Sequence, residues 1–227
     1  MKTQDEVVVE HVDVLIVGAG ISGVGAAYHL TQQCPGKTFT VLEGMDDFGG
    51  TWLMHRYPGI RSDSDLYTFG YRFKPWVGAP IATAAEIRKY MGEVIDENDL
   101  AKFIRYGHRV GNASWSSDDS LWTIDAVHDG QPLRFTANFL WMCQGYYRHA
   151  EGYTPEWPGM KDFHGPIVHP QTWPTDLDYK GKKVIVIGSG ATAATLVPNM
   201  ADDCEHVTIL QRSPTFFWTS RDRKSVV

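Results

Sequence analysis

The sequence predicts an α/β protein built from two βαβ units. Two runs of β-branched and apolar residues, 12–17 and 183–187, each lead directly into a glycine-rich turn. A helix-like stretch and a second short strand follow each turn. Between the two units, residues 121–143 form strand-like segments around a hairpin signal. Alternating strands and helices of this kind favour parallel sheets covered by helices.

The first glycine-rich turn carries Gly18, Gly20 and Gly23, and the second strand of its unit ends at Glu43. This is the G-x-G-x-x-G fingerprint of dinucleotide binding in its expected context. Gly18 permits the tight turn, Gly20 lets the backbone approach a pyrophosphate, and Gly23 lets helix and strand pack closely. The following helix offers free N–H groups to phosphates, and Glu43 can accept hydrogen bonds from a ribose. The alternative is a glycine-rich turn in another α/β fold.

The segment between the units predicts one helix and a small antiparallel meander. Thr83 and Glu86 form a capping box before apolar residues at helical spacing. Asp129-Gly130 is a strong hairpin signal between two strand-like runs. We therefore expect an antiparallel β-meander inserted into the first dinucleotide domain, followed by a linker rich in Gly, Pro and aromatic residues over 146–158.

The second turn has Ala193 in place of the third glycine, so its pattern is G-x-G-x-x-A. Its second strand, 206–210, is followed by Arg212 and contains no terminal carboxylate. A carboxylate at this point favours a free 2′-hydroxyl, whereas arginine pairs with a 2′-phosphate. The first site therefore suits FAD or NAD and the second suits NADP; the alternative for Arg212 is a solvated surface side chain. The predicted contacts of the second nucleotide are Gly188, Ser189, Gly190, Ala191, Thr192, Ala193, Arg212 and Ser213.

Composition narrows the classes of function. The chain has 227 residues and a net charge of -6, so it lacks the basic surface that nucleic-acid binding requires. We expect no transmembrane segment, because the longest uncharged stretch near the start contains glycines and a histidine, and no secretory signal. Three distant cysteines favour a cytoplasmic protein, with peripheral membrane association left open. His164 and His169 lack partners for a metal site, so we predict none.

Specific motifs carry a family resemblance. The chain resembles the group B flavin-dependent monooxygenases of the Baeyer–Villiger type from about residue 12 to about residue 219. Its second turn, followed by Arg212-Ser213-Pro214, is similar to the subgroup of ethionamide-activating monooxygenases. The blocks Gly49-Gly50-Thr51-Trp52 and 57–63 agree with the resemblance. The family pattern F-x-G-x-x-x-H-x-x-x-W-P is matched by Phe163, Gly165, His169, Trp173 and Pro174.

The resemblance implies an activity. NADPH would reduce FAD, dioxygen would add to give a peroxyflavin, and one oxygen atom would be transferred to a small-molecule ketone, sulfide or thioamide. His169 and Trp173 would couple cofactor binding to domain movement; aromatic packing of a loop is the alternative. Asp63 would support an active-site arginine that the chain itself does not supply, and a turn-capping aspartate is the alternative there. The implied FAD contacts are Gly18, Gly20, Ser22, Gly23, Glu43, Gly50, Thr51, Trp52, Arg61, Asp63 and Val110.

The resemblance also implies a domain organisation: an FAD-binding domain over 1–149, a linker over 150–178 and the first part of an NADP-binding domain over 179–221. Family members are longer, so we expect both dinucleotide domains to be incomplete here, residues 222–227 to be a non-native tail, and the 227 residues alone to be inactive. Two other interpretations of the function remain open. One is a non-catalytic nucleotide-binding fragment. The other is a different two-dinucleotide flavin oxidoreductase, although the disulfide reductases need a cysteine pair that is absent near Trp52.

Overall fold

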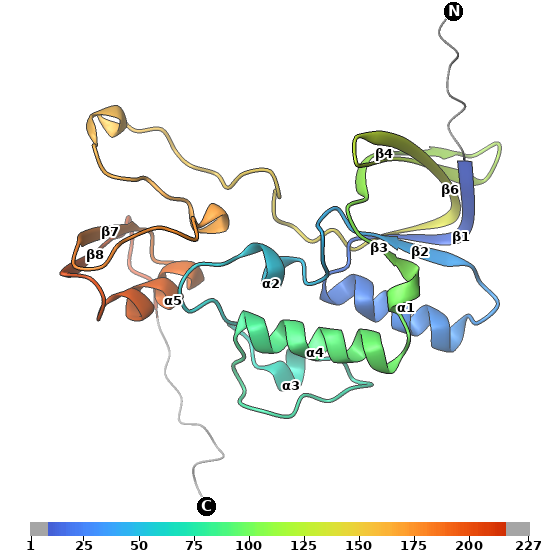
Figure 1. Ribbon diagram of the computed structural model, residues 1–227, viewed down its shortest axis with the longest axis horizontal. Coiled ribbons are helices and arrows are strands. Elements are labelled where there is room, and N and C mark those ends of the chain that lie inside the picture. The colour runs from blue at the N-terminus through green and yellow to red at the C-terminus, as the bar shows by residue number, and fades with distance from the viewer. Residues whose placement is uncertain (1–8, 217–227) are drawn as a thin grey trace, which may run out of the picture.

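The computed structural model describes residues 9–216, and the predicted tail over 222–227 lies outside the described residues. Figure 1 shows two lobes joined by an extended segment, and the short helix α2 (Thr51–Met54) lies between them. The larger lobe contains the first βαβ unit and the smaller lobe the second. Both predicted units are present, each with a parallel strand pair around one helix.

The larger lobe is organised by a six-stranded sheet in the order β3-β2-β1-β6-β5-β4. Strands β1, β2, β3 and β6 run parallel, and β4 and β5 complete the sheet with antiparallel pairing. Strand β2 and the last four residues of β1 are buried, as expected where a parallel sheet is covered on both faces. The strands are β1 (Val9–Val17), β2 (Phe39–Leu42), β3 (Ile104–Arg105), β4 (Arg109–Ser116), β5 (Leu121–His128) and β6 (Gln131–Met142).

Two helices, α1 (Ile21–Gln33) and α4 (Ala84–Glu97), cover one face of this sheet. The predicted capping box at the start of α4 is confirmed, because Thr83 accepts from the Glu86 N–H and Glu86 accepts from the Thr83 N–H. The apolar side of α4, including Met91, is buried against α1. The short helix α3 (Leu66–Phe69) packs beside them. Between α3 and α4, aromatic side chains such as Tyr71 and Phe73 extend this core.

The predicted meander exists but is not a separate sheet. Asp129 and Gly130 adopt positive φ and close the hairpin between β5 and β6, as predicted. However, β6 is twelve residues long, and its residues 134–142 pair in parallel with β1. The insertion therefore continues the main sheet, because a single long strand can bond to β5 on one side and to β1 on the other.

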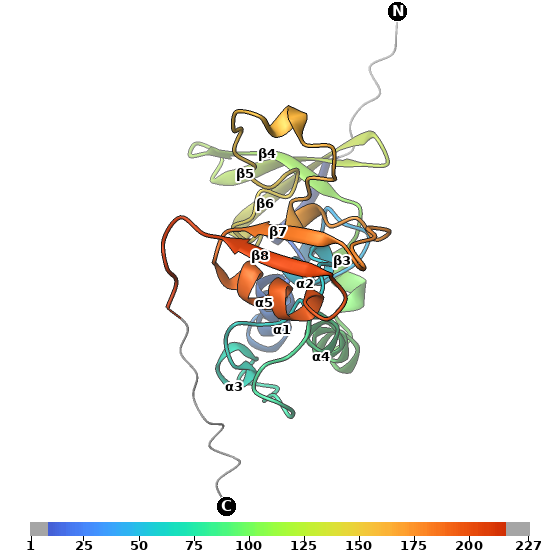
Figure 2. The same ribbon diagram turned by 90° about the vertical axis from the view of Figure 1, so that its left-hand side faces the viewer.

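The smaller lobe contains β7 (Lys183–Ile187), α5 (Ala191–Met200) and β8 (His206–Leu210). Strands β7 and β8 pair in parallel, and α5 packs against them. Figure 2 views the molecule from this lobe, with β7 and β8 in front of the larger lobe. Residues 143–182 connect the lobes and contain only two short 3₁₀ helices, η2 (Met160–Asp162) and η3 (Pro170–Thr172).

Candidate functional site

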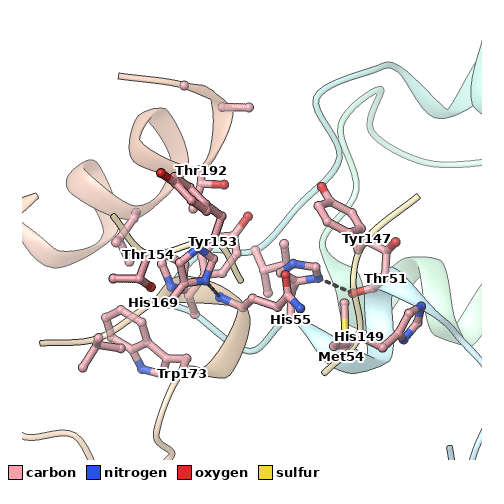
Figure 3. Close-up of a pocket in the computed structure, with 18 of the residues that line it drawn as sticks. Thr51, Met54, His55, Tyr147, His149, Tyr153, Thr154, His169, Trp173 and Thr192 are labelled. Carbon is pink, nitrogen blue, oxygen red and sulfur yellow. Dashed lines mark hydrogen bonds between the residues drawn. The ribbon is translucent and has the colours of Figure 1, made fainter. Parts of the chain in front are cut away.

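A single cavity of about 1750 Å³ lies between the lobes. It is lined by both glycine-rich turns, by α2 and by the connecting segment, and Figure 3 shows part of its wall. Pockets for one drug-sized ligand usually measure roughly 300–1000 Å³, so this cavity is large enough for more than one such molecule. In the structure, both fingerprints thus line the same cavity.

The glycines of the first turn differ in how much room the protein leaves for a side chain. Gly18 has a φ of +100°, and a side chain there would also meet the Cys143 carbonyl oxygen at 2.7 Å. A Cβ at Gly23 would lie 1.8 Å from the Gly18 carbonyl oxygen, so this position must be glycine for the helix to start where it does. A Cβ at Gly20 would meet only the Gly50 Cα, at 3.8 Å. The protein itself leaves room at Gly20, and that room faces the cavity.

Glu43 is buried beside the first turn at the end of β2. Its carboxylate accepts hydrogen bonds from the Ala19 N–H at 2.7 Å and from the Met45 N–H at 2.9 Å. It therefore holds the turn in place and still lines the cavity. Because a carboxylate can accept about four hydrogen bonds, Glu43 retains acceptor capacity for a ribose.

Helices α1 and α5 both begin without a side-chain cap. Their first turns follow Gly20 and Gly190, neither of which can supply a capping oxygen. The free N–H groups and the positive end of each helix dipole favour anions such as phosphate. Helix α4, which does not line the cavity, has a complete capping box instead. Among the three helices of ten or more residues, the two that begin at the cavity are thus the ones without a side-chain cap.

The second turn repeats this geometry with small differences. Gly188 has a φ of +117°, and a Cβ at Gly190 would meet nothing within 4 Å. Ala191, Thr192 and Ala193 begin α5 and line the cavity. Ser189 does not line it, because its hydroxyl group is 2.6 Å from the Thr215 Oγ1 and 3.5 Å from the Ser213 carbonyl oxygen.

The predicted 2′-phosphate contacts lie next to the second turn. Ser213 is placed there by its contact with Ser189, and Arg212 precedes it, two residues after the end of β8. Both residues are exposed and lie outside the cavity lining. An exposed arginine beside the turn can reach the outer edge of a bound nucleotide, and the solvated alternative stays open.

The other predicted FAD contacts gather at the larger lobe's side of the cavity. Thr51 and Trp52 lie at the start of α2, after Gly50 with a φ of +54°. Arg61 and Val110 line the cavity too. Asp63 lines it in an exposed position, near enough to Tyr57 and Tyr147 for its negative charge to help raise the pKa of both hydroxyl groups. The structure brings all these residues and Ser22 together on one wall, whereas Gly23 lies behind it.

The predicted monooxygenase pattern lies within the connecting segment. The His169 ring accepts from the Gln171 N–H at 3.2 Å and so caps η3. It also fills the space at Gly152, where a Cβ would lie 2.1 Å from the ring. Trp173 packs against the apolar cluster around Tyr57, while Pro174 lies outside the cavity lining. Phe163 is exposed, and its ring folds over Gly165.

These contacts of His169 and Trp173 are those of loop packing, which was the alternative considered for them. A role in coupling cofactor binding to domain movement stays a prediction. Both residues line the cavity.

His55, at the end of α2, is buried in the cavity wall, and burial lowers its pKa. Its Nδ1 donates to the Thr51 carbonyl oxygen at 3.1 Å, which leaves Nε2 as the acceptor of the neutral ring. The rings of Tyr57 and Tyr147 pack against it edge-on. His149 and His169 are close enough that their charges would lower the His55 pKa further (Figure 3).

The sequence profile described as "Flavin-binding monooxygenase-like" matches residues 80–224, and a profile for an NAD(P)-binding Rossmann-like domain matches residues 16–77. The chain belongs to the flavin-binding monooxygenase-like family. The resemblance to flavin monooxygenases and the α/β fold with Rossmann-like dinucleotide domains are thereby confirmed.

Relatives support membership of the monooxygenase-like family. FAD-containing monooxygenase EthA of Mycolicibacterium smegmatis is 54% identical over 209 residues, which cover 91% of this chain and 42% of that protein. Probable FAD-binding monooxygenase AlmA of an Acinetobacter species is 51% identical, over 92% of this chain and 43% of that protein. The chain thus spans less than half the length of these relatives.

Solved structures are similar to the fold. Oxidised steroid monooxygenase bound to NADP superposes with a TM-score of 0.80 and 33% identity, covering 95% of this chain and 41% of that one. Cyclohexanone monooxygenase with bound cyclohexanone gives a TM-score of 0.79 and 28% identity, over 91% and 40% of the two chains.

Sequence reasoning gave no role to Tyr57, His55 or His149, which all line the cavity. For Tyr57 the Tyr-Pro-Gly order was a usable signal, because it predicts a tight turn that presents the tyrosine. Nothing local in the sequence distinguishes the two histidines. Among residues 9–216, no group of three potential metal-ligating side chains gathers. None of the helices in the described part of the chain combines the length and apolar character needed to cross a bilayer.

Proposed function

We propose that the protein is an FAD- and NADPH-dependent monooxygenase that inserts one oxygen atom from dioxygen into a small organic substrate. The observation that carries this proposal is the placement of two dinucleotide fingerprints, from separate βαβ units, on one continuous cavity. Two cofactors that face each other across a shared space can exchange a hydride. The relatives named for FAD and the solved structure bound to NADP support the choice of cofactors.

The first turn fits FAD. The room at Gly20 and the uncapped start of α1 suit a pyrophosphate, with Ser22 as a further donor. Glu43 would bind the ribose, and Thr51 with Trp52 would lie along the flavin. Asp63 would support the group that stabilises developing negative charge at the reaction centre. Arg61 and Val110 complete the proposed FAD contacts.

The second turn fits NADP(H) by the same criteria. A Cβ at Gly190 would fill only open space, and α5 begins uncapped. Arg212 and Ser213 lie at the outer edge of this turn, where a 2′-phosphate would project. FAD supplies the reaction with dioxygen; the chain's own residues would orient the two nucleotides and exclude water from the space between them.

Small-molecule ketones, sulfides and thioamides are the proposed substrates, and we propose no nucleic-acid partner. The domain boundaries 1–149, 150–178 and 179–221 belong to the proposal and are consistent with the lobes. A cytoplasmic location is also part of the proposal, and the three free thiols of the described chain support it.

The direct test is an oxygenation assay on the intact protein. We expect NADPH-dependent conversion of a simple ketone or sulfide, with one atom of ¹⁸O₂ in the product. NADPH oxidation that yields hydrogen peroxide with every sulfide, thioamide and ketone tried would contradict the monooxygenase assignment.

A further inference from the structure

A short arm of the larger lobe, residues 55–60, reaches across to the smaller lobe. Both ends of the arm are held by the larger lobe. The His55 N–H donates to the Thr51 carbonyl oxygen at 3.1 Å, and the Ala84 N–H donates to the Ile60 carbonyl oxygen at 3.1 Å. The arm is therefore anchored at both ends to the lobe that carries the first fingerprint.

The arm is shaped by its own sequence. The Ile60 N–H donates to the Tyr57 carbonyl oxygen at 3.2 Å and closes a tight turn. Pro58 fixes the second position of this turn, and Gly59 adopts a φ of +76° at the third. Proline followed by a residue with positive φ is the pattern of a type II turn. The turn projects Tyr57 away from the larger lobe.

The tip of the arm packs onto α5. Tyr57 is only 7% exposed and forms an apolar cluster with Leu196 and Met200 of α5. Its hydroxyl group interacts with the side chain of Thr192. Gly59 approaches so closely that a Cβ there would lie 2.1 Å from the Asn199 side-chain nitrogen. That nitrogen is already committed to the Thr195 carbonyl oxygen at 2.7 Å.

One of these contacts, that of Tyr57 with Thr192, reaches the first turn of α5, whereas the others lie farther along the helix. Thr192 is the second residue of the helix and lines the cavity beside the uncapped N–H groups. We infer that Tyr57 is a positioning residue for the second nucleotide site, which orients Thr192 and the start of α5 toward a bound pyrophosphate. The arm thereby makes the second site depend on the lobe that contains the first. This inference rests on the proposed function, because it takes the second site to bind NADP(H).

The first test changes the fit of the arm without touching the nucleotide site. Gly59→Ala forces a methyl group against Asn199, and Asn199→Ala removes the obstacle. Gly181→Ala is the matched control, since Gly181 has a φ of +63° and open space around its Cβ position. The measurement is calorimetric titration of the intact, FAD-loaded protein with NADP⁺.

We expect Gly59→Ala to weaken NADP⁺ binding roughly 5- to 20-fold, and the double variant Gly59→Ala/Asn199→Ala to recover to within about threefold of Asn199→Ala alone. Gly181→Ala should bind like the wild type, and FAD content should be equal in all variants. Equal NADP⁺ affinity in Gly59→Ala and wild type would overturn the inference, as would a loss that Asn199→Ala fails to rescue.

The second test removes only the hydroxyl group. Tyr57→Phe keeps the apolar cluster and should weaken NADP⁺ binding roughly 3- to 10-fold, with the unfolding midpoint and FAD content unchanged. In the Thr192→Val background the same substitution should have no further effect. Additive losses would overturn a pathway through Thr192. A wild-type protein that binds FAD but not NADP⁺ would instead refute the proposed function, and the inference with it.

Discussion

The first βαβ unit buries its strands, whereas the second exposes much of its own. Ile16 and Val41 of the first unit are fully buried, while Ile185 and Ile209 of the second are 63% and 47% exposed. Even so, both turns present the same features to the cavity, a glycine with positive φ followed by an uncapped helix. The comparison teaches that this shared geometry is set by the turn and the helix start rather than by the extent of the sheet.

The two units differ at the third position of the fingerprint, which is Gly23 in the first unit and Ala193 in the second. A Cβ at Gly23 would collide with the Gly18 carbonyl oxygen, but Ala193 carries a real Cβ and is buried. Helix α5 must therefore start slightly farther from its turn than α1 does. Glycine at position 23 is a requirement of folding, whereas we propose that glycine at positions 20 and 190 is a requirement of ligand binding.

The largest effect is expected at this third position. Gly23→Ala should lower the free energy of unfolding by about 3 kcal/mol or more, since the clash is with backbone. Ala193→Gly should cost only about 1 kcal/mol, the usual helix penalty of glycine. Urea unfolding of the two variants beside the wild type measures both. Similar losses at the two positions would show that the helices start alike.

The second prediction separates the two cofactors. Gly20→Val should weaken FAD binding by about 10- to 100-fold, equivalent to about 1.4–2.8 kcal/mol of overpacking against the ligand, and leave protein that lacks the yellow flavin absorbance. Gly190→Val should do the same to NADP⁺ and keep the flavin. Flavin content and NADP⁺ titration are the measurements. If Gly20→Val retains full flavin, the two sites are assigned the wrong way round.

The third prediction concerns the arginine that follows β8. Arg212→Ala should raise the KM for NADPH more than that for NADH, because a charge-assisted phosphate contact is worth about 1.5–3 kcal/mol. Arg148→Ala, an exposed arginine outside the cavity lining, should leave the ratio of the two KM values unchanged. Equal changes for both cofactors in Arg212→Ala would mean that the side chain is only solvated.

The smallest effect is expected at the wall between the sites. Because burial lowers the His55 pKa, the unfolded chain binds the proton more tightly than the folded one. The contribution of His55 to stability is therefore complete above its ordinary pKa of 6.5 and is lost as the pH falls below that value. The melting temperatures of wild type and His55→Gln are measured between pH 8 and 5.5. We expect the melting temperature of the wild type to fall more than that of His55→Gln as the pH decreases. Parallel curves would refute this.

Much of this arrangement could be predicted from local sequence. The two turns, the capping box and the hairpin each depend on residues within a few positions of one another, and all were found. The pairing of β6 with β1 was missed, because parallel pairing over more than 120 residues leaves no local trace. Tyr57 and His55 were missed for the same reason, since their roles depend on segments that approach them only in the folded protein.

Anaerobic reduction of the flavin tests the shared cavity most directly. NADPH is mixed with the intact, FAD-loaded protein in a stopped-flow spectrometer, and the flavin absorbance is followed. We predict rapid bleaching in the wild type, and in Gly190→Val bleaching that is slow and requires much higher NADPH while the flavin stays bound. Flavin that dithionite reduces but NADPH does not, or bleaching that Gly190→Val leaves unchanged, would contradict two nucleotides facing each other across one cavity.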